Sequence, residues 1–417
     1  MLVDVDTLEK QPVINRIWEN FLLKSEIDQG LSISVRIFKS LGVFALFSLV
    51  IEEFKFFPYF RPIQELSVLV LFGFLIHTCI QIAWGKRLSG FEVYNIFVII
   101  FIPLLSSITA RFVFGQPVIY GLLAERGMIF VVGSLLVISL LRSGRLSLVD
   151  LEKGLIFGGW LTLIAYSLLY LFVPPGQFSE YEGFVGGGGV EPYQYHFVGL
   201  FIIFSFCYYF IQWIQTGRAR AGIFTVLFFS YLVLDGGRSL LISVFAAGGI
   251  YLVKAASPRL WIIRILPGMA FFIMGGLFYL NTPHGMFLLE KFHAAFQVVF
   301  TGQETTDASA NARIFETLVA LPYIQDHWLL GNGKISHRWH EGFEGVMGAY
   351  FYPSDIGLVG ALFLYGVVGL AILGYQLVYL WRCRRIFRMK RRLVFADALV
   401  VFLLYQVIHS FVTGRIF

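Results

Sequence analysis

Residues 281–355 read NTPHGMFLLEKFHAAFQVVFTGQETTDASANARIFETLVALPYIQDHWLLGNGKISHRWHEGFEGVMGAYFYPSD, and they form the only long segment not built from membrane-length apolar runs. The segment holds five of the eight histidines and ends at Asp355. Apolar runs long enough to cross a bilayer lie on both sides of it. We therefore expect 281–353 to be a polar lid over a site that is embedded in the membrane.

The composition indicates an all-α polytopic membrane protein. Of 417 residues, 58% are hydrophobic and only 14% are charged, and the mean hydropathy is +0.76. A soluble domain needs more charge than this to cover its surface. The three cysteines lie in or beside different apolar runs, which predicts neither a disulfide framework nor a metal site. The first residues are acidic rather than apolar, so we expect no cleavable signal peptide.

Eleven apolar runs approach the roughly 20 residues that a membrane-spanning helix needs. We predict about 11 spans, within a range of 10 to 13, because some runs are short or broken. The preceding residues 1–30 fit either an amphipathic helix on the membrane surface or a loosely ordered tail. The runs are 31–51, 65–84, 93–110, 127–141, 154–173, 195–214, 219–234, 239–253, 261–280, 354–381 and 394–412.

The distribution of Lys and Arg predicts the topology. If the N-terminus is cytoplasmic, the inner segments hold 20 of the 32 Lys and Arg residues and the outer segments hold 10. The positive-inside rule requires this bias, so we expect 281–353 on the outer side. The net charge of +6 is then largely topological and predicts no nucleic-acid binding.

Two arginines stand on the predicted outer side, where the rule expects few cations. Arg126 directly precedes one apolar run, and Arg238 follows Asp235-Gly-Gly at a break between two short runs. A helix break beside charges must be buried in protein or line a wet cavity. An Asp235–Arg238 pair that merely neutralises itself is the alternative, and it also needs a cavity.

Another predicted outer loop, 174–194, contains four consecutive glycines at 186–189. Such glycines permit a close backbone approach or a mobile flap. Glu191 and Tyr195, which follow them, are candidate substrate contacts. The loop contains no phosphate-loop motif, so we expect no nucleotide site there.

Within 281–355 we expect two helices. The first covers Met286–Phe300 with an apolar face, and the second is capped by Ser309 or Asn311 and runs to about His327. Arg313 then falls in the first turn of the second helix, where a helix N-terminus and a guanidinium together suit a diphosphate. A solvated surface arginine is the alternative.

Three motifs in this order resemble the bacterial O-antigen polymerase and O-antigen ligase superfamily. They are Gly236-Gly-Arg-Ser-Leu-Leu241, the segment Asn311-Ala-Arg313 … Ala320-Leu-Pro322 … Leu330-Gly-Asn-Gly333, and Ser354-Asp-Ile-Gly … Tyr365-Gly-Val-Val-Gly369. The motifs cover about 220–370, and the topology of the whole chain is similar to that of the superfamily.

The resemblance implies a metal-independent and cofactor-independent glycosyltransferase of the bacterial inner membrane, with a fold similar to the C-type glycosyltransferases. Its activity would be polymerisation of undecaprenyl-diphosphate-linked oligosaccharide repeat units of O-antigen, capsule or exopolysaccharide at the outer face. Arg238 and Arg313 would hold the diphosphate, with Arg126 as a weaker candidate. Membrane lipids and a chain-length regulator protein are the implied partners.

One departure favours a polymerase over a ligase. The ligases carry a His-Asn pair about eleven residues before the Gly-x-x-Gly motif, and eleven residues before Gly366, the first glycine of that motif here, stands Asp355. Asp355 is a candidate general base, and an N-cap of the following helix is the alternative reading. His337 or His340 could replace the missing histidine if the loop folds back.

The remaining candidates for substrate binding are Asp235, His337, Arg338, His340 and Tyr352. Aromatic rings suit stacking on sugars, although they are also ordinary at a membrane interface. A ligase remains the alternative function within the superfamily. A transporter or flippase would be a different class, and the chain shows no internal repeat of the kind that transporters usually carry.

Overall fold

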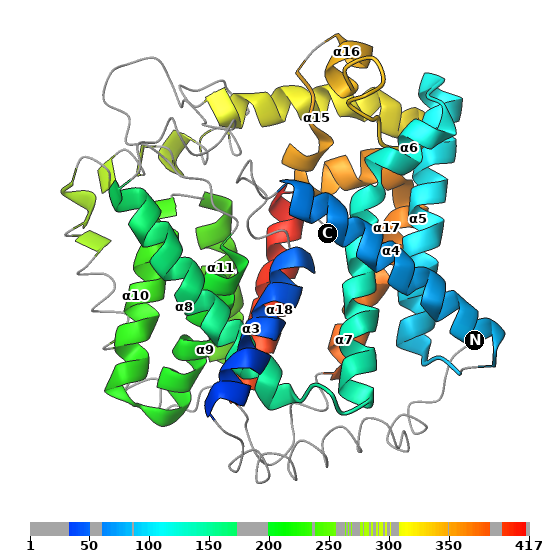
Figure 1. Ribbon diagram of the computed structural model, residues 1–417. Helices are drawn as coiled ribbons and strands as arrows, with labels where there is room; N and C mark the ends of the chain where they lie inside the picture. The colour runs from blue at the N-terminus through cyan, green and yellow to red at the C-terminus, as the bar shows by residue number, and fades with distance from the viewer. Residues whose placement is uncertain are drawn as a thin grey trace. The chain divides into compact units, whose positions relative to one another are not determined.

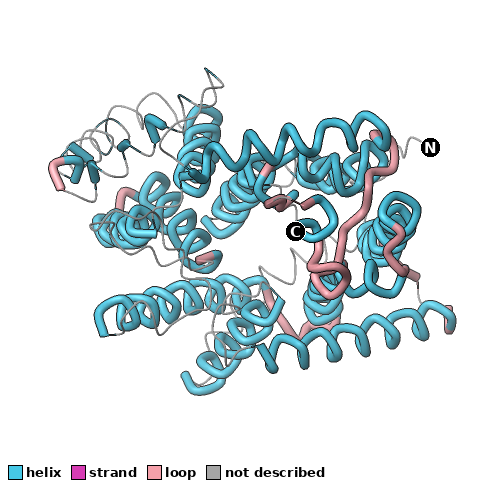
Figure 2. The backbone as a smooth tube through the Cα atoms, turned by 90° about the horizontal axis from the view of Figure 1, so that it is seen from above, coloured by secondary structure: helices cyan, strands magenta, loops and turns pink. Residues whose placement is uncertain are grey.

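The described part of the chain is all-helical, as predicted. The computed structural model describes residues 33–50, 61–85, 87–172, 199–235, 238–255, 308–348, 350–383 and 394–413, with separate positions between 263 and 301. Helices joined by loops make up these ranges, and no strand occurs in them (Figure 2).

The apolar runs fold as helices almost where the sequence places them. The run 261–280 lies mostly outside the described residues, and each of the other ten contains helix. The helical elements are α3 (Ile33–Val50), α4 (Arg61–Ala83), α5 (Gly90–Phe114), α6 (Val118–Ala124), η3 (Arg126–Val131), α7 (Val132–Arg142), α8 (Leu148–Phe172), α9 (Leu200–Thr216), α10 (Ala219–Asp235), α11 (Arg238–Ala255), α15 (Ala308–His327), α16 (Phe343–Met347), η6 (Pro353–Asp355), α17 (Gly357–Cys383) and α18 (Val394–Thr413).

Several of these helices are suited to a membrane. Among the described residues, four are long and apolar enough to cross one, or five if Val118–Ala124 and Arg126–Arg142 form one broken span. The side chains of Leu69, Val70 and Phe72 on α4 are more than half exposed, as expected of a surface that meets lipid. The chain is therefore a multi-pass membrane protein, and the count of eleven spans remains a prediction.

The chain divides into two compact units, which are described separately. Unit 1 is Met1–Asn95, Ile129–Glu180 and Phe197–Ser205, and unit 2 is Ile96–Met128, Tyr181–His196 and Phe206–Phe417. In unit 1, α3 packs along α8, and α4 packs on α7. A Cβ atom added to Gly154 of α8 would lie 2.4 Å from Val43 of α3, and one on Gly158 would lie 2.8 Å from Phe201. The Gly154-x-x-x-Gly158 spacing thus lets neighbouring helices approach α8 closely.

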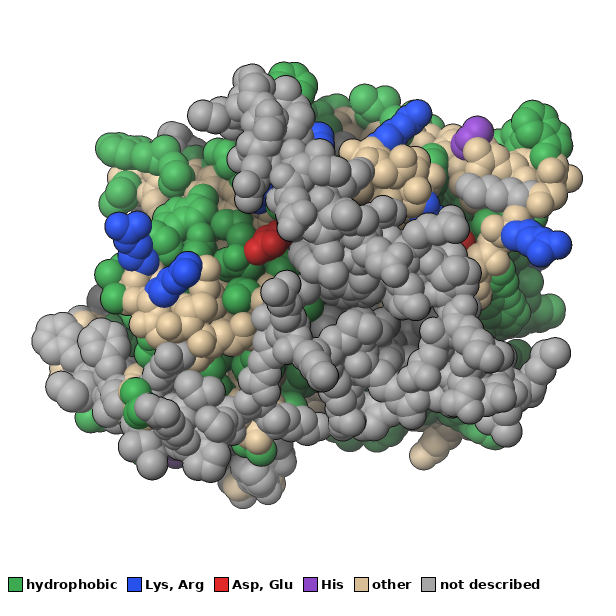
Figure 3. All heavy atoms as spheres, turned by 90° about the horizontal axis from the view of Figure 1, so that it is seen from below, with side chains coloured by type: hydrophobic (Ala, Val, Ile, Leu, Met, Phe, Trp, Pro, Cys, Tyr) green, Lys and Arg blue, Asp and Glu red, His purple; other side chains and the backbone are tan. Residues whose placement is uncertain are grey.

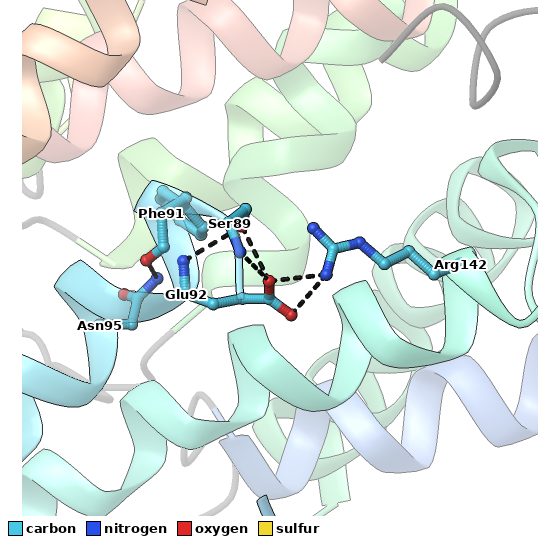
Figure 4. Close-up of polar contacts among 5 residues, drawn as sticks. All are labelled: Ser89, Phe91, Glu92, Asn95 and Arg142. Atoms are coloured by element: carbon cyan, nitrogen blue, oxygen red, sulfur yellow. Dashed lines mark hydrogen bonds and ion pairs between the residues drawn. The ribbon is translucent and has the colours of Figure 1, made fainter. Parts of the chain in front are cut away.

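Unit 1 also holds an ion pair at the start of α5, between the buried Glu92 and the partly exposed Arg142 (Figure 4). Arg142 Nη1, at the end of α7, donates to Glu92 Oε1 at 2.7 Å and to Oε2 at 2.6 Å. Ser89 donates to the same carboxylate through its N–H and its hydroxyl, each at 2.8 Å. This capping box and the arginine fix the entry into α5.

In unit 2, α15, α16 and the start of α17 lie together at one end (Figure 1). An aromatic cluster of Phe114, Tyr323, Phe343, Phe351 and Phe363 joins them. Phe351 and Phe363 are fully buried, with ring centroids 5.1 Å apart, and Phe343 lies 5.6 Å from Phe351. Each such pair adds about 0.5–1.5 kcal/mol beyond its area burial, so the cluster anchors α15 and the 343–351 segment to α17.

On the face shown in Figure 3, the few Lys and Arg side chains that are visible do not gather into one patch. Buried polar side chains occur in both units, and the buried carboxyl groups of the candidate site, Glu125 and Glu316, lie in unit 2.

Candidate functional site

α17 is broken at Gly366, and a loop from the polar segment fills the break. Gly366 has φ 61° and ψ −174°, a conformation open almost only to glycine. In an unbroken helix the N–H groups of Val367 and Val368 would bond to the carbonyls of Phe363 and Leu364. Instead Val367 donates to Trp328 O at 2.9 Å, and Val368 donates to Leu329 O at 3.1 Å.

The freed carbonyls of α17 are satisfied by the same loop. Asn332 N–H donates to Phe363 O at 2.8 Å, and Gly333 N–H donates to Leu364 O at 2.9 Å. The buried Asn332 side chain adds a second bond to Phe363 O at 3.1 Å. Four backbone bonds therefore replace two helical ones, which is the compensation that a break inside an apolar helix requires.

The loop is held equally firmly on its other side. Lys334 N–H donates to Ser106 Oγ of α5 at 3.0 Å. The side chain of Gln116, fully buried, donates to Lys334 O at 3.0 Å and accepts from Ser336 N–H at 2.8 Å. Residues 328–336 therefore form an inserted loop between α17 and α5.

Glu125 is the polar centre of this insertion. It is only 2% exposed, and its carboxylate accepts bonds from Ser106 Oγ at 2.7 Å and Tyr365 Oη at 3.2 Å. The Lys334 ammonium lies 3.9 Å from Glu125 Oε2. A buried carboxylate that accepts two hydrogen bonds and lies near a cation is suited to a structural role.

A second cluster lies where α15 meets the 350–355 segment. Glu316 of α15 is fully buried, and its Oε1 accepts the Tyr352 N–H at 3.0 Å. Its Oε2 has no hydrogen-bond partner within the described residues. Burying a carboxyl oxygen without a hydrogen-bond partner costs free energy. In this respect Glu316 differs from Glu125, whose carboxylate accepts two hydrogen bonds.

The surroundings of Glu316 favour its neutral form. Burial raises the pKa of Glu316 to about 7, the Tyr352 N–H opposes this shift, the Asp355 charge adds to it, and Arg313 opposes it. Burial also raises the pKa of the Tyr350 phenol, and the negative charge of Asp355 contributes. We call Arg313, Glu316, Tyr350, Tyr352 and Asp355 the carboxyl cluster.

Asp355 keeps access to solvent while Glu316 does not. It is the last residue of the 3-10 turn η6, and its carboxylate is partly exposed. Within the described part of the chain it accepts one hydrogen bond, from Ser354 Oγ at 3.2 Å. Because α17 begins at Gly357, its N-cap position falls on Ile356, so the interpretation of Asp355 as that cap is wrong.

Arg313 of the carboxyl cluster does not lie at a helix start. The second helix of the polar segment ends at His327, as predicted, but it begins at Ala308. At 3.6 residues per turn, Arg313 is in the second turn, so its predicted first-turn position is wrong, and Ser309 and Asn311 are not its caps. Its guanidinium therefore acts as a charge beside Glu316 and gains nothing from a helix N-terminus.

The loop residues 337–342 supply aromatic and basic groups next to this cluster. The His337 ring lies 6.4 Å from the Tyr352 ring, and Tyr352 lies 4.8 Å from Tyr350. His340 packs edge-on against Trp339 at 4.5 Å, and it has φ 46°. Arg338 is exposed on the same loop. His337 of this loop and Tyr352, both candidates for substrate binding, therefore lie together.

The other predicted site residues are not brought to the carboxyl cluster by any contact described. Arg126 is exposed at the start of η3, directly after the buried Glu125. Asp235 ends α10 and Arg238 begins α11, and their side chains lie outside the described residues. Glu191 and Tyr195 also lie outside them, as does most of the predicted helix 286–300.

Glu316 and Glu125 were not predicted from the sequence. Glu316 follows Arg313 by three residues, so the two resemble an ordinary surface pair on one helical face. Glu125 directly precedes Arg126, which drew attention as an outer cation. Among the described residues, no group of three or more His, Cys, Asp or Glu side chains could hold a metal ion.

Comparison with known proteins gives no assignment: no family model matches the chain, and no curated protein matches it either.

Proposed function

We propose that the protein is a membrane glycosyltransferase that polymerises undecaprenyl-diphosphate-linked oligosaccharide repeat units at the outer face of the bacterial inner membrane. The observation that carries the proposal is the carboxyl cluster. There, Arg313 stands three residues before the buried Glu316 on α15, and Glu316 accepts the N–H of Tyr352, three residues before the partly exposed Asp355. The membrane-suited helices on both sides support a lipid-borne substrate.

The two groups fit the two needs of the reaction. When the acceptor hydroxyl oxygen bonds to the anomeric carbon, the bond from that carbon to the phosphate oxygen breaks, and its electron pair leaves with the diphosphate. Arg313 would stabilise this charge through bidentate contacts and stays cationic at any relevant pH. Asp355 would take the hydroxyl proton as general base.

Other residues complete the proposed site. Arg238 is a second candidate ligand of the diphosphate, and Arg126 a third. Tyr352 and His337 offer a ring surface on which a sugar can stack beside Asp355. Residues 281–353, which carry every member of this cluster except Asp355, would cover the site from the outer side.

The test of the activity is incubation of the purified protein with a lipid-linked repeat unit, followed by sizing of the products. A ladder of longer glycans on the same lipid supports a polymerase. Transfer of one glycan to a different acceptor would support a ligase instead. No transfer, together with movement of the lipid-linked unit across vesicles, would support a flippase.

The test of Asp355 is the substitution Asp355→Asn at matched expression. Asparagine keeps the size and a hydrogen-bond acceptor but cannot take the proton, so we expect polymer formation to fall about a hundredfold or more. Wild-type rates and chain lengths would reject Asp355 as the base and would turn attention to His337 or His340.

The test of the arginines is the comparison of alanine with lysine. Arg238→Ala and Arg313→Ala should abolish polymer with little loss of protein. Arg313→Lys keeps the charge but loses the bidentate geometry, so it should also be strongly impaired. Full activity of Arg313→Lys would show that a point charge is sufficient and that the bidentate argument is wrong.

A further inference from the structure

Three consecutive residues of the inserted loop expose large apolar side chains. Trp328 is 54% exposed, Leu329 is 47% exposed and Leu330 is 44% exposed. The loop residues that follow are mostly buried, and they include Gly331, Asn332, Gly333, Ile335 and Ser336. In water, a run of exposed apolar side chains beside buried polar ones is unfavourable, so this run indicates an interaction surface.

The backbone of this run is bonded to the apolar part of α17. The Trp328 and Leu329 carbonyls accept the N–H groups of Val367 and Val368. Both valines lie inside Gly357–Gln376, a stretch long and apolar enough to cross a membrane. The Val367 side chain is itself 45% exposed, as expected of a surface that meets lipid. The exposed side chains of 328–330 therefore continue the apolar surface of a membrane-suited helix.

α5 places the inserted loop at the same level. The exposed apolar side chains in the second part of this helix recur every three or four residues, so they form one stripe about 22 Å long. The stripe consists of Phe97, Ile100, Leu104, Ile108 and Phe112. The loop reaches α5 through the Lys334 N–H, which donates to Ser106 Oγ at 3.0 Å. Because Ser106 lies between Leu104 and Ile108 along the helix, the loop meets α5 within its apolar stripe.

The residues just before the run set its depth. Gln325, Asp326 and His327 are exposed and polar, and Trp328 follows them directly. Tryptophan is enriched at the boundary between lipid and water. Irregular backbone below that boundary needs hydrogen-bond partners within the protein, and α17 provides them for the Trp328 and Leu329 carbonyls. The boundary therefore falls at Trp328.

We propose that residues 328–330 are a lipid-inserting turn, in which Trp328 lies at the level of the lipid headgroups and Leu329 and Leu330 lie among the acyl chains of the same leaflet. The polar segment 281–353 is thus not surrounded by water throughout, because it re-enters the membrane at this turn. The inference goes beyond the proposed function and depends on no transfer reaction, so a failure of either leaves the other standing.

The test is the accessibility of a nitroxide label on the turn, in the full-length protein reconstituted into phosphatidylcholine vesicles. The label is attached through Leu329→Cys or, in a second variant, Leu330→Cys. The background lacks the native cysteines Cys79, Cys207 and Cys383. Collisions of the label with dissolved oxygen, which concentrates among acyl chains, are compared with collisions with a water-soluble nickel chelate. Two positions on the turn are used so that one folded variant is sufficient.

Two exposed residues provide the matched controls. Ile108→Cys carries the label on the stripe of α5, and Glu344→Cys carries it on the polar segment outside the inserted loop. We expect the oxygen-to-nickel ratio on the turn to match that of Ile108→Cys and to exceed that of Glu344→Cys about tenfold, because acyl chains exclude a polar chelate.

Two other results would overturn the inference. A ratio on the turn equal to that of Glu344→Cys would mean that water surrounds 328–330. Low accessibility to both reagents would mean that protein covers the turn, either another part of this chain or a second copy of it.

Discussion

Glu316 links the stability of the fold to pH. Its pKa is raised from 4.5 to about 7, mainly by burial. A raised pKa means that the folded state prefers the protonated acid, so the stabilisation is complete below about pH 4.5 and is lost as the pH rises through about 7. The shift corresponds to about 3 kcal/mol at most.

We therefore expect Glu316→Gln to gain stability over wild type as the pH rises from 5 to 8, because glutamine carries no charge to bury. Thermal unfolding in detergent at both pH values measures this. Glu344→Gln should follow wild type, since Glu344 is exposed. If wild type and Glu316→Gln lose stability in parallel, Glu316 is not the group that titrates.

The candidate residues differ in whether they could be predicted from the sequence. Asp355 was predicted from motif spacing and Arg313 from its place on a helix and in a resemblance motif, and the charges of both act on Glu316. Glu316 itself could not be predicted, because its burial depends on the 350–355 segment folding back onto α15. That contact joins residues far apart in the chain, and the local pattern around position 316 is that of an ordinary amphipathic helix.

At the scale of elements, Gly366 should be indispensable to α17. A Cβ atom there would lie 2.4 Å from Leu329 O, and the backbone has φ 61°. We expect Gly366→Ala to cost at least about 2 kcal/mol from strain alone. Gly374→Ala is the matched control in the same helix, since nothing lies within 4 Å of its added Cβ. Thermal unfolding and folded yield should separate the two, and equal behaviour would mean that the inserted loop does not stabilise the break.

The ion pair between Glu92 and Arg142 should contribute more to the stability of the fold than an exposed cation nearby does. Arg142→Ala leaves a carboxylate that is 5% exposed without its guanidinium. Because Arg142 is itself partly exposed, we expect a cost of about 1–3 kcal/mol, below that of a fully buried pair. Arg145→Ala removes an exposed cation from the same turn and should cost less than about 0.5 kcal/mol. Matching losses of thermal stability would contradict the special role of the pair.

The helices show which structural features the hydropathy pattern predicts and which it does not. Apolar runs gave the helices well, because length and hydropathy are local properties. The run 354–381 appeared continuous, and nothing local reveals that Gly366 breaks it. The break depends on backbone groups of 328–333, which carry another of the resemblance motifs, so the structure explains why two glycine-rich motifs occur in one chain.

At the scale of the whole molecule, the prediction to test is which side of the membrane each polar segment faces. From the distribution of Lys and Arg, we expect Glu344 outside and Arg145 inside. In a background without Cys79, Cys207 and Cys383, Glu344→Cys should react with an impermeant thiol reagent in intact spheroplasts. Arg145→Cys should react only after the membrane is opened. Reaction of Arg145→Cys in intact cells, with protection of Glu344→Cys, would invert the topology.

The helical class of the molecule was predictable because 58% hydrophobic content leaves few alternatives. The number of spans was less predictable. Four described helices meet the length and apolarity of a span, while α9, α10 and α11 are apolar but shorter. Short helices of this kind pack inside a bundle or cross a membrane depending on their neighbours, and their own sequence does not decide between the two.

The broken helix α17 also constrains how the protein is made. Residues 328–333, which satisfy the exposed backbone at Gly366, leave the ribosome before Gly366 does. Their partner helix therefore enters the bilayer when its complement has already been synthesised. A chain whose synthesis stopped between 333 and Gly366 would contain the loop but not the broken helix that the loop fills. A helix inserted alone would carry bare peptide groups into lipid, each at a cost of several kcal/mol. Synthesis in this order gives the inserting helix its missing partner as soon as it arrives.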